Sequence, residues 1–142
     1  MHDLTKLKFI AGCHPVSKDN AVFESLTADT KGFDEALCLI DVGVTDAATS
    51  AAPKIQDSPD DSTWTDVTGA ALADAIGAAE DAKLFAIHLE DLSKHDRYLQ
   101  ALFTAGNGTT GTVASCLWIL GKPTQNAPTT AAEAGLEELI KV

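Results

Sequence analysis

Turn-forming residues divide this chain into short apolar segments, and their spacing is the feature that most restricts its fold. Clusters of Gly, Pro, Asn, Asp and Ser recur roughly every 8 to 12 residues, which is the strand spacing of β-sandwiches. Between the clusters, residues 36–44, 83–90 and 97–105 alternate with a period of two, as half-buried strands do. The pattern predicts an all-β protein, mainly antiparallel, built as a β-sandwich or a jelly roll.

Three regions are expected along the chain. Residues 1–20 mix charged and apolar side chains with little periodicity, which predicts an extended N-terminal arm, a natural interaction element. Residues 21–123 contain the strand patterns and predict the sandwich domain. Residues 124–142 predict a C-terminal tail or short helix, because Thr130 and Glu133 have the spacing of a capping box.

The alternation also predicts which side chains face the core. In the strand expected at residues 36–44, one face carries Cys38, Ile40, Val42 and Val44. Leu37 and Leu39 lie on the other face, so this strand is expected to be covered on both faces at its start. Residues 97–105 and 112–120, joined by a glycine turn, are expected to be adjacent strands. The expected core residues are Ile40, Val42, Trp64, Phe85, Ile87, Leu99, Phe103 and Trp118.

The segment KIQDSPDDSTWTDV, residues 54–67, predicts a hairpin. Pro59 presets a turn between two strand-forming segments, and Trp64 is expected to pack between the sheets. The acidic residues of the segment are Asp57, Asp60, Asp61 and Asp66. Their spacing is not that of a calcium-binding loop, so a solvated turn is favoured, with weak calcium binding as the alternative. Residues 68–82 are expected to be a long loop with at most two helical turns.

No motif in the sequence predicts catalysis or a bound cofactor. Gly106, Gly108 and Gly111 match a dinucleotide-binding spacing, but β-branched and aromatic residues follow them, so a hairpin turn is favoured. The histidines, whose spacing matches no zinc motif, are His2, His14, His88 and His95. Cys13 and His14 are neighbours whose side chains would point to opposite faces of a strand. We expect no enzyme, no cofactor and no metal site.

The charge balance limits the partners. The chain has 21 acidic and 10 basic residues, a net charge of -11, which repels nucleic-acid phosphates and anionic membranes. We expect neither as a partner. Three cysteines without C-x-x-C spacing predict reduced, mostly buried thiols. The apolar stretch before Cys13, residues 9–12, is shorter than the roughly 7 to 15 residues of a signal peptide, so export is not expected.

Three short motifs follow one another between about residues 29 and 123. The first, which enters an apolar strand, comprises Asp29, Lys31, Gly32 and Phe33. The second, in the hairpin segment, comprises Gln56, Ser58, Asp60, Ser62, Trp64, Asp66 and Val67. The third comprises Arg97, Tyr98, Leu99, Thr104 and Gly106. In this order the motifs resemble those of a group of small structural proteins of tailed bacteriophages.

The resemblance implies a β-sandwich or jelly-roll virion protein, most specifically a capsid cement (decoration) protein that binds the outside of a phage head. It implies the major capsid protein and further copies of the chain, as a homotrimer, as partners. The implied location is the capsid surface, after synthesis in the host cytoplasm. Within the arm we expect a short strand at Leu7 to Ala11, and the expected capsid contacts are Leu7, Phe9 and Ile10. The alternatives are a tail or head-fibre associated sandwich module and, less favoured, a small nucleotide-binding protein.

Overall fold

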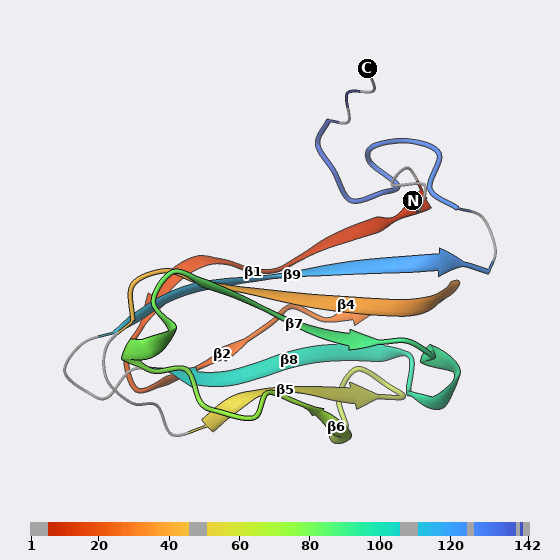
Figure 1. Ribbon diagram of the computed structural model, residues 1–142. Coiled ribbons are helices and arrows are strands. Elements are labelled where there is room, and N and C mark those ends of the chain that lie inside the picture. The colour runs from red at the N-terminus through yellow and green to blue at the C-terminus, as the bar shows by residue number, and fades with distance from the viewer. Residues whose placement is uncertain (1–5, 46–50, 106–110, 125–126, 139, 141–142) are drawn as a thin grey trace.

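The computed structural model describes residues 6–45, 51–105, 111–124, 127–138 and 140, which form two antiparallel sheets (Figure 1). Sheet A has the order β1-β9-β4-β7. Its strands are β1 (Lys8–Lys18), β9 (Thr112–Pro123), β4 (Phe33–Val42) and β7 (Lys83–Leu89). Sheet B has the order β2-β8-β5-β6, and the short β3 also pairs with β8. Its strands are β2 (Ala21–Glu24), β3 (Ala28–Asp29), β5 (Ala51–Ser58), β6 (Thr65–Ala71) and β8 (Tyr98–Ala105).

The strand pairing follows a nested pattern. β1 pairs with β9, β2 and β3 pair with β8, β4 pairs with β7, and β5 pairs with β6. The chain therefore resembles one long hairpin whose successive strand pairs lie alternately in sheet A and sheet B. This is the winding of a jelly roll. The expected all-β sandwich is confirmed, and its connectivity is that of the jelly-roll form.

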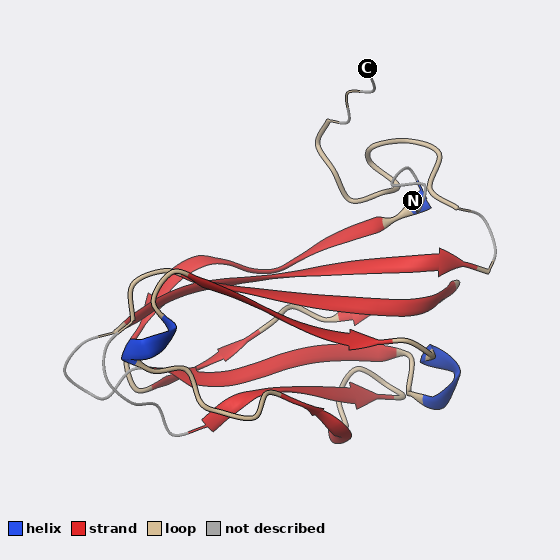
Figure 2. Cartoon of the chain, in the orientation of Figure 1, coloured by secondary structure: helices blue, strands red, loops and turns tan. Residues whose placement is uncertain are grey.

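The core lies between the two sheets. Phe23 and Phe103 stack in it with their ring centroids 4.5 Å apart, and the indole Nε1 of Trp118 donates to Ser25 Oγ at 3.3 Å. Of the expected core residues, the buried ones are Ile40, Val42, Ile87, Leu99, Phe103 and Trp118. Phe85 is half-buried and packs against this cluster. Within the described residues, helical structure is limited to short turns, among them η2 (Ala78–Glu80) and η3 (Leu92–Lys94) (Figure 2).

The N-terminal segment differs from the extended arm expected over residues 1–20. From Lys8 to Lys18 it is a full strand that pairs along β9. The register of this pairing shifts on both sides of Cys13, and such bulges interrupt the alternation of inward and outward side chains. For this reason the sequence shows little periodicity there. Residues 1–5 lie outside the described part of the chain.

Two further expectations need correction. Residues 97–105 and 112–120 were expected to form adjacent strands, yet β8 lies in sheet B and β9 in sheet A. The glycine turn expected between them falls mostly on residues 106–110, outside the described residues. Residues 68–82 are not wholly a loop, since β6 continues to Ala71. The hairpin expected at residues 54–67 is confirmed as the antiparallel pair of β5 and β6.

Trp64 does not pack between the sheets as expected. Its side chain is half-buried and is absent from the core cluster of the described residues. The reason is its position at the entry to β6, which lies at the edge of sheet B and exposes most of its side chains. Val44, expected on the core face of β4, is also exposed, because β4 ends at Val42.

The described residues of the C-terminal segment contain one helical turn with a cap at each end. Thr130 Oγ1 accepts from the backbone amide of Glu133, and Glu133 Oε2 accepts from that of Thr130, which completes the expected capping box. Gly135, with φ at 77°, ends the turn. The amide of Leu136 then donates to Ala131 O at 2.9 Å, the bond of a Schellman motif. The segment is thus a tail with one capped turn.

Candidate interaction surface

The acidic hairpin tip is a structural turn. Asp60 Oδ1 accepts from the amides of Ser62 at 3.0 Å and Thr63 at 2.7 Å. These hydrogen bonds, that from Thr63 first, lower the pKa of the Asp60 carboxyl. Asp66 is held elsewhere, by Lys54 Nζ at 2.7 Å. Among the described residues, no group of three or more His, Cys, Asp or Glu side chains is placed to hold a metal ion.

The residues considered for catalysis are not brought together. Cys13 Sγ donates to the backbone oxygen of His14 at 3.4 Å, so the two make no thiol–imidazole pair. His88 Nε2 lies 3.6 Å from a Glu35 oxygen, and His95 Nδ1 lies 3.6 Å from one of Asp57. His2, Gly106 and Gly108 fall outside the described residues. At Gly111, a Cβ atom would lie 2.9 Å from the carbonyl oxygen of Lys18, so this glycine packs against β1.

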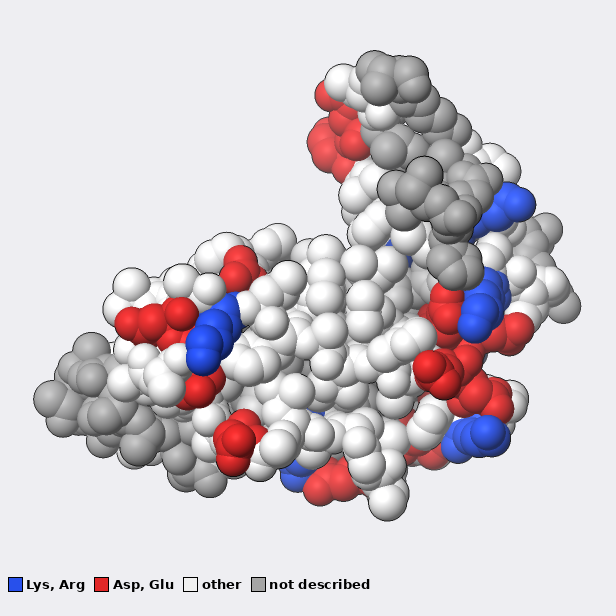
Figure 3. Space-filling model, in the orientation of Figure 1, with Lys and Arg blue, Asp and Glu red and all other residues white. Residues whose placement is uncertain are grey.

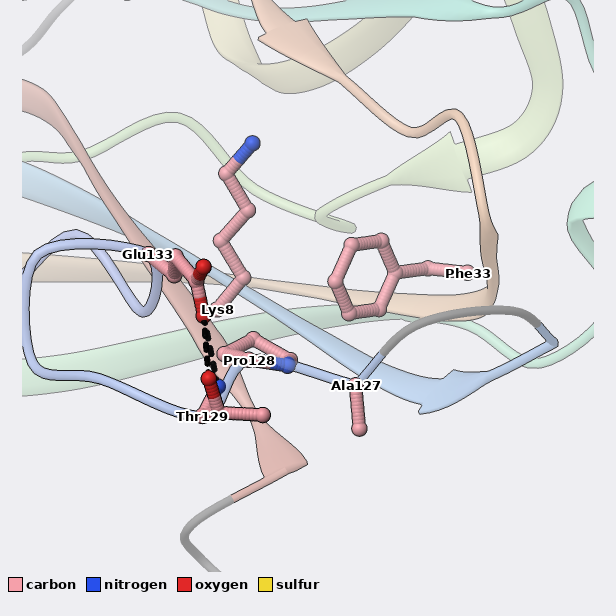
Figure 4. A pocket seen from close by; sticks show the side chains of 6 residues that line it. All are labelled: Lys8, Phe33, Ala127, Pro128, Thr129 and Glu133. Carbon is pink, nitrogen blue, oxygen red and sulfur yellow. Dashed lines mark hydrogen bonds between the residues drawn. The ribbon is translucent and has the colours of Figure 1, made fainter.

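One cavity, of about 520 Å³, lies where the C-terminal tail meets the ends of β1 and β4. Figure 4 shows the side chains that line it, with Glu133 turned toward Thr129. The Glu133 carboxylate accepts from both the amide and the hydroxyl of Thr129 at 2.8 Å. It is therefore committed to holding the tail turn. The cavity is a gap beneath the tail rather than a chemically equipped site.

A second cavity, of about 360 Å³, lies between the edge strands β6 and β7 and beside η3. Its wall includes charged groups that already have partners. Lys94 Nζ lies 2.9 Å from Asp91 Oδ2, and the pKa of the Asp91 carboxyl is lowered to about 2, first by hydrogen bonds from Ser93 and then by Lys94. These contacts stabilise the η3 turn and do not define a ligand site.

The most distinctive surface is the outer face of sheet A. The strand register sets its side chains in rows, and two adjacent rows in the middle of the sheet are almost wholly apolar. The first row is Phe9, Ile119, Leu37 and His88, and the second is Ala11, Leu117, Leu39 and Ala86. Leu84, 63% exposed, and Val113, 39% exposed, extend it toward one end. We call these residues the apolar face.

Charged side chains border the apolar face at its ends. Asp41 pairs with Ser115 and Leu84 at one end, and Glu35 lies beside Gly121 at the other, where it forms an ion pair with Lys122 at 2.8 Å. Figure 3 shows the result: acidic and basic side chains gather toward the two ends of the molecule, with an uncharged band over the middle of β1, β9, β4 and β7. Asp41 lies between the two central rows and Val113, so the uninterrupted part of the apolar face is the two rows themselves.

The outer face of sheet B has the opposite character. Gln100 Nε2 donates to Gln56 Oε1 at 2.8 Å, and Gln56 in turn donates to Asp66 at 2.6 Å. Lys54 pairs with the same carboxylate. These groups form a polar network across β8, β5 and β6, as expected for a sheet face that meets water. Only sheet A, therefore, is apolar on both faces.

The expected capsid contacts fall on different sides of β1. Ile10, which is half-buried, pairs with the buried Trp118 and packs against the core on the inner side of β1. Phe9 belongs to the apolar face, beside the tail, and its amide donates to Ala134 O at 2.7 Å. Leu7 is half-buried just before β1. The sequence signal for the apolar face was the pair Leu37 and Leu39, which indicated a strand covered on both faces.

No protein-family model matches the chain, and no curated protein matches it. Among solved structures, the chain is similar to one from the disulfide-linked pili of Bacillus endospore appendages, with a TM-score of 0.39 and 14% sequence identity. The similarity covers 82% of this chain and 88% of that chain. No helix in the described part of the chain is long and apolar enough to cross a membrane. A likeness this weak leaves the protein's own surface as the guide to function.

Proposed function

We propose that this protein is a non-enzymatic structural protein of a phage virion, a capsid cement protein that binds the outer surface of the head through the apolar face. The observation that carries the proposal is the contrast between the two outer faces. Sheet B presents a hydrogen-bonded polar network, whereas sheet A presents Leu37, Leu39 and Leu117 in the middle of an uncharged surface. An apolar sheet face is stabilised when another surface excludes water from it.

The size of the apolar face suits such a contact. The two apolar rows cross four strands about 4.8 Å apart and take up four residues of strand length at about 3.3 Å per residue, which gives roughly 250 Å². Exposed apolar patches often mark interaction sites. At about 25 cal/mol per Å², burial of the two rows contributes roughly 6 kcal/mol, toward the low end of the about 4 to 15 kcal/mol that association costs. One copy is therefore expected to bind weakly.

Weak binding by one copy explains why self-association belongs to the proposal. Contacts between neighbouring copies add to attachment, because a second contact becomes intramolecular once the first has formed. We place these contacts at the sandwich edges and expect three copies per unit, as the phage motifs imply. The edge strands β6 and β7 are open on one side. A cement protein then stabilises the shell by binding the assembled state and not the dissociated subunits.

The winding of the fold and the order of the sequence motifs support the same proposal. Jelly rolls are common in viral capsid proteins but also occur in lectins and other proteins, so the fold alone does not select a function. Among the functions of jelly rolls, the phage-like motifs favour that of a virion protein. Asp29 of the first motif and Arg97 of the third form a two-pronged ion pair, with contacts of 2.7 and 2.6 Å. Two motifs distant in sequence thus meet in one structural feature.

The test is co-sedimentation of the purified protein with undecorated phage heads. We expect the wild type to pellet with the heads and to raise their disruption temperature. Leu39→Lys and Leu117→Lys place a charge in the apolar face, and each should abolish binding while circular dichroism shows the fold retained. The matched control is Leu102→Lys on the outer face of sheet B, where Leu102 pairs with Lys54 and Glu24.

The possible outcomes test the proposed cement role and the proposed contact surface separately. If wild-type protein leaves the heads bare, the cement role is wrong, and labelling of whole virions should then place the protein on the tail if it is a tail or head-fibre module. If Leu39→Lys and Leu117→Lys bind as well as wild type, the apolar face is not the contact. If Leu102→Lys also fails to bind, the loss reflects added charge and not this face.

A further inference from the structure

All three cysteines of the chain lie close together in sheet A, on three neighbouring strands. Cys13 on β1 is the Cα partner of Cys116 on β9. Cys38 on β4 is diagonal to Cys116, whose direct partner on that strand is Ile40. All three are free thiols. Cys38 and Cys116 are buried, whereas Cys13, on the edge strand, is partly exposed.

The backbone of β1 is irregular where it passes Cys116. The register shifts on both sides of Cys13, so that Gly12 and Cys13 together lie opposite Cys116. A Cβ atom on Gly12 would lie 2.6 Å from Cys116 Sγ. The absence of a side chain at Gly12 therefore lets the Cys116 sulfur lie against β1. Bulges of this kind redirect side chains, and here Cys13 packs against the core cluster that contains Cys116.

Cys38 and Cys116 share a hydrogen bond that makes the two thiols unequal. The bond lowers the pKa of the Cys116 thiol, while the same bond and burial raise the pKa of Cys38. Cys38 is thus the donor that keeps its proton, because it is the more deeply buried of the two. The thiolate is the attacking form of a cysteine. Cys116 is the better nucleophile of this pair.

We propose that Cys13 and Cys116 form an intramolecular disulfide when the folded protein meets a low-molecular-weight disulfide such as oxidised glutathione. Cys13, the accessible thiol, loses its proton and attacks one sulfur of the reagent, which releases one small thiol and leaves a mixed disulfide. Cys116 then attacks the Cys13 sulfur and releases the second small thiol. Two protein thiols are oxidised and one reagent disulfide is reduced to two thiols, so hydrogens and electrons balance.

The register selects Cys13 as the partner. Directly opposite residues of antiparallel strands have Cα atoms about 4.5 to 5.5 Å apart, within the roughly 4.4 to 6.8 Å that disulfides span. Diagonal neighbours lie about 7 to 8 Å apart, at or beyond the upper end of that span, so the direct partner Cys13 is favoured over Cys38. Cys38 is a positioning residue that donates to Cys116, and it remains a thiol.

The disulfide would join the first strand of the jelly roll to the last. It would close a loop of most of the chain, the case in which a cross-link restricts the unfolded state most. It would also fix the edge strand β1, which carries Phe9 of the apolar face. Such a bond forms in oxidising surroundings and is rare in a reducing cytoplasm. The proposal concerns the thiols alone and does not depend on the capsid role.

The experiment treats the folded full-length protein with oxidised glutathione and counts free thiols after denaturation. We expect three thiols before treatment and one after it, a mass lower by two hydrogen atoms, no retained glutathione, and a cross-linked peptide pair that contains Cys13 and Cys116. The oxidised protein should also melt at a higher temperature than the reduced protein. Retention of all three thiols, or a stable glutathione adduct as the final product, would overturn the proposal.

Two variants test the assignment of the three roles. Cys38→Ala keeps Cys13 and Cys116, so both remaining thiols should still be lost on oxidation. The mixed disulfide should be converted more slowly, because the donor to Cys116 is gone. Cys13→Ser should keep both remaining thiols uncoupled. If Cys13→Ser forms a Cys38–Cys116 bond instead, or if Cys38→Ala forms none, the proposed pairing is wrong. Circular dichroism of each variant establishes that the reaction is measured on folded protein.

Discussion

The two tryptophans occupy different environments, and their contributions to stability should differ accordingly. Trp118 is fully buried at the centre of β9, and its indole nitrogen donates to Ser25 Oγ. That hydroxyl also accepts from the amide of Ala101 in sheet B at 2.8 Å. One buried serine therefore links the largest core ring of sheet A to the backbone of sheet B. Trp64 makes no comparable contribution to the core cluster.

We predict that Trp118→Ala lowers the free energy of unfolding by about 3 to 5 kcal/mol, because it leaves a large cavity in the core. Trp64→Ala should cost only about 1 kcal/mol, since a half-buried residue outside the core loses little packing. Urea unfolding followed by circular dichroism measures both. Equal losses for the two variants would contradict the buried position of Trp118 or the peripheral position of Trp64.

Sequence patterns could not tell these tryptophans apart. Both lie in segments rich in β-branched residues, and alternation alone places each on some face of a strand. What separates them is their position: Trp118 lies in β9, inside sheet A, whereas Trp64 lies just before β6, at the edge of sheet B. The core residues on central strands, such as Ile40 and Leu99, were predictable because their neighbours continue the same alternation. Residues at a sheet edge lack neighbours that continue the alternation.

At the scale of elements, the C-terminal tail shows how a short segment can be fixed without a helix. Its single turn is capped at both ends, and Ala134 O then accepts from the Phe9 amide of β1. Gly135 sits directly beside this contact. Its φ of 77° favours glycine, and a Cβ atom there would collide with the carbonyl oxygen of Phe9. The tail can dock on β1 only because residue 135 has no side chain.

We predict that Gly135→Ala releases the tail from β1. The added methyl group strains the turn and displaces the contact with Phe9, so limited proteolysis should cut the C-terminal segment faster than in wild type. The global unfolding transition should change little, because the core residues are untouched. Gly43→Ala is the matched control, since a Cβ atom there meets Val113 only at ordinary distances from 3.4 Å. Equal cleavage of wild type and Gly135→Ala would show that the tail is not held this way.

Element boundaries were predictable where turn chemistry was strong. The hairpin of β5 and β6 followed from Pro59 and its neighbouring acids, and the capping box followed from Thr130 and Glu133. The extent of β1 was not predictable, because bulges beside Cys13 break its alternation. Nor could the sequence show that β8 and β9 enter different sheets, since a connection between sheets and a hairpin both need only a flexible turn. Of the apolar face, the sequence indicated only Leu37 and Leu39, on a strand expected to be covered on both faces.

At the scale of the whole molecule, two electrostatic effects act on the carboxyl groups in opposite directions: general repulsion and local hydrogen bonds. The chain carries a net charge of -11, and general repulsion would raise the pKa of carboxyls in the folded state. The pKa is nevertheless lowered at Asp29, Asp60, Asp66, Asp91 and Glu133. For Asp29 the main cause is the hydrogen bond from Arg97, and for Asp66 it is the bond from Lys54.

These shifts predict that acid destabilises the protein. A carboxyl with a lower pKa in the folded state binds fewer protons there than in the unfolded chain, so stability rises with pH across the window between the two values. The contribution is fully present above the unfolded value of about 4 and is lost as pH falls through the folded value. For Asp91 that folded value is about 2. Urea unfolding should therefore give a free energy that falls steadily from about pH 5 to about pH 2.

Asp60→Asn identifies one source of this dependence. The amide retains part of the turn but cannot ionise, so the variant should lose less stability than wild type between pH 5 and pH 2. Asp61→Asn is the control: the carboxylate of Asp61 accepts from Thr27 Oγ1 at 2.7 Å, and its φ of 61° is one that Asn tolerates. A wild-type stability that rises on acidification would mean that relief of charge repulsion outweighs the hydrogen bonds to Asp60 and the other carboxylates.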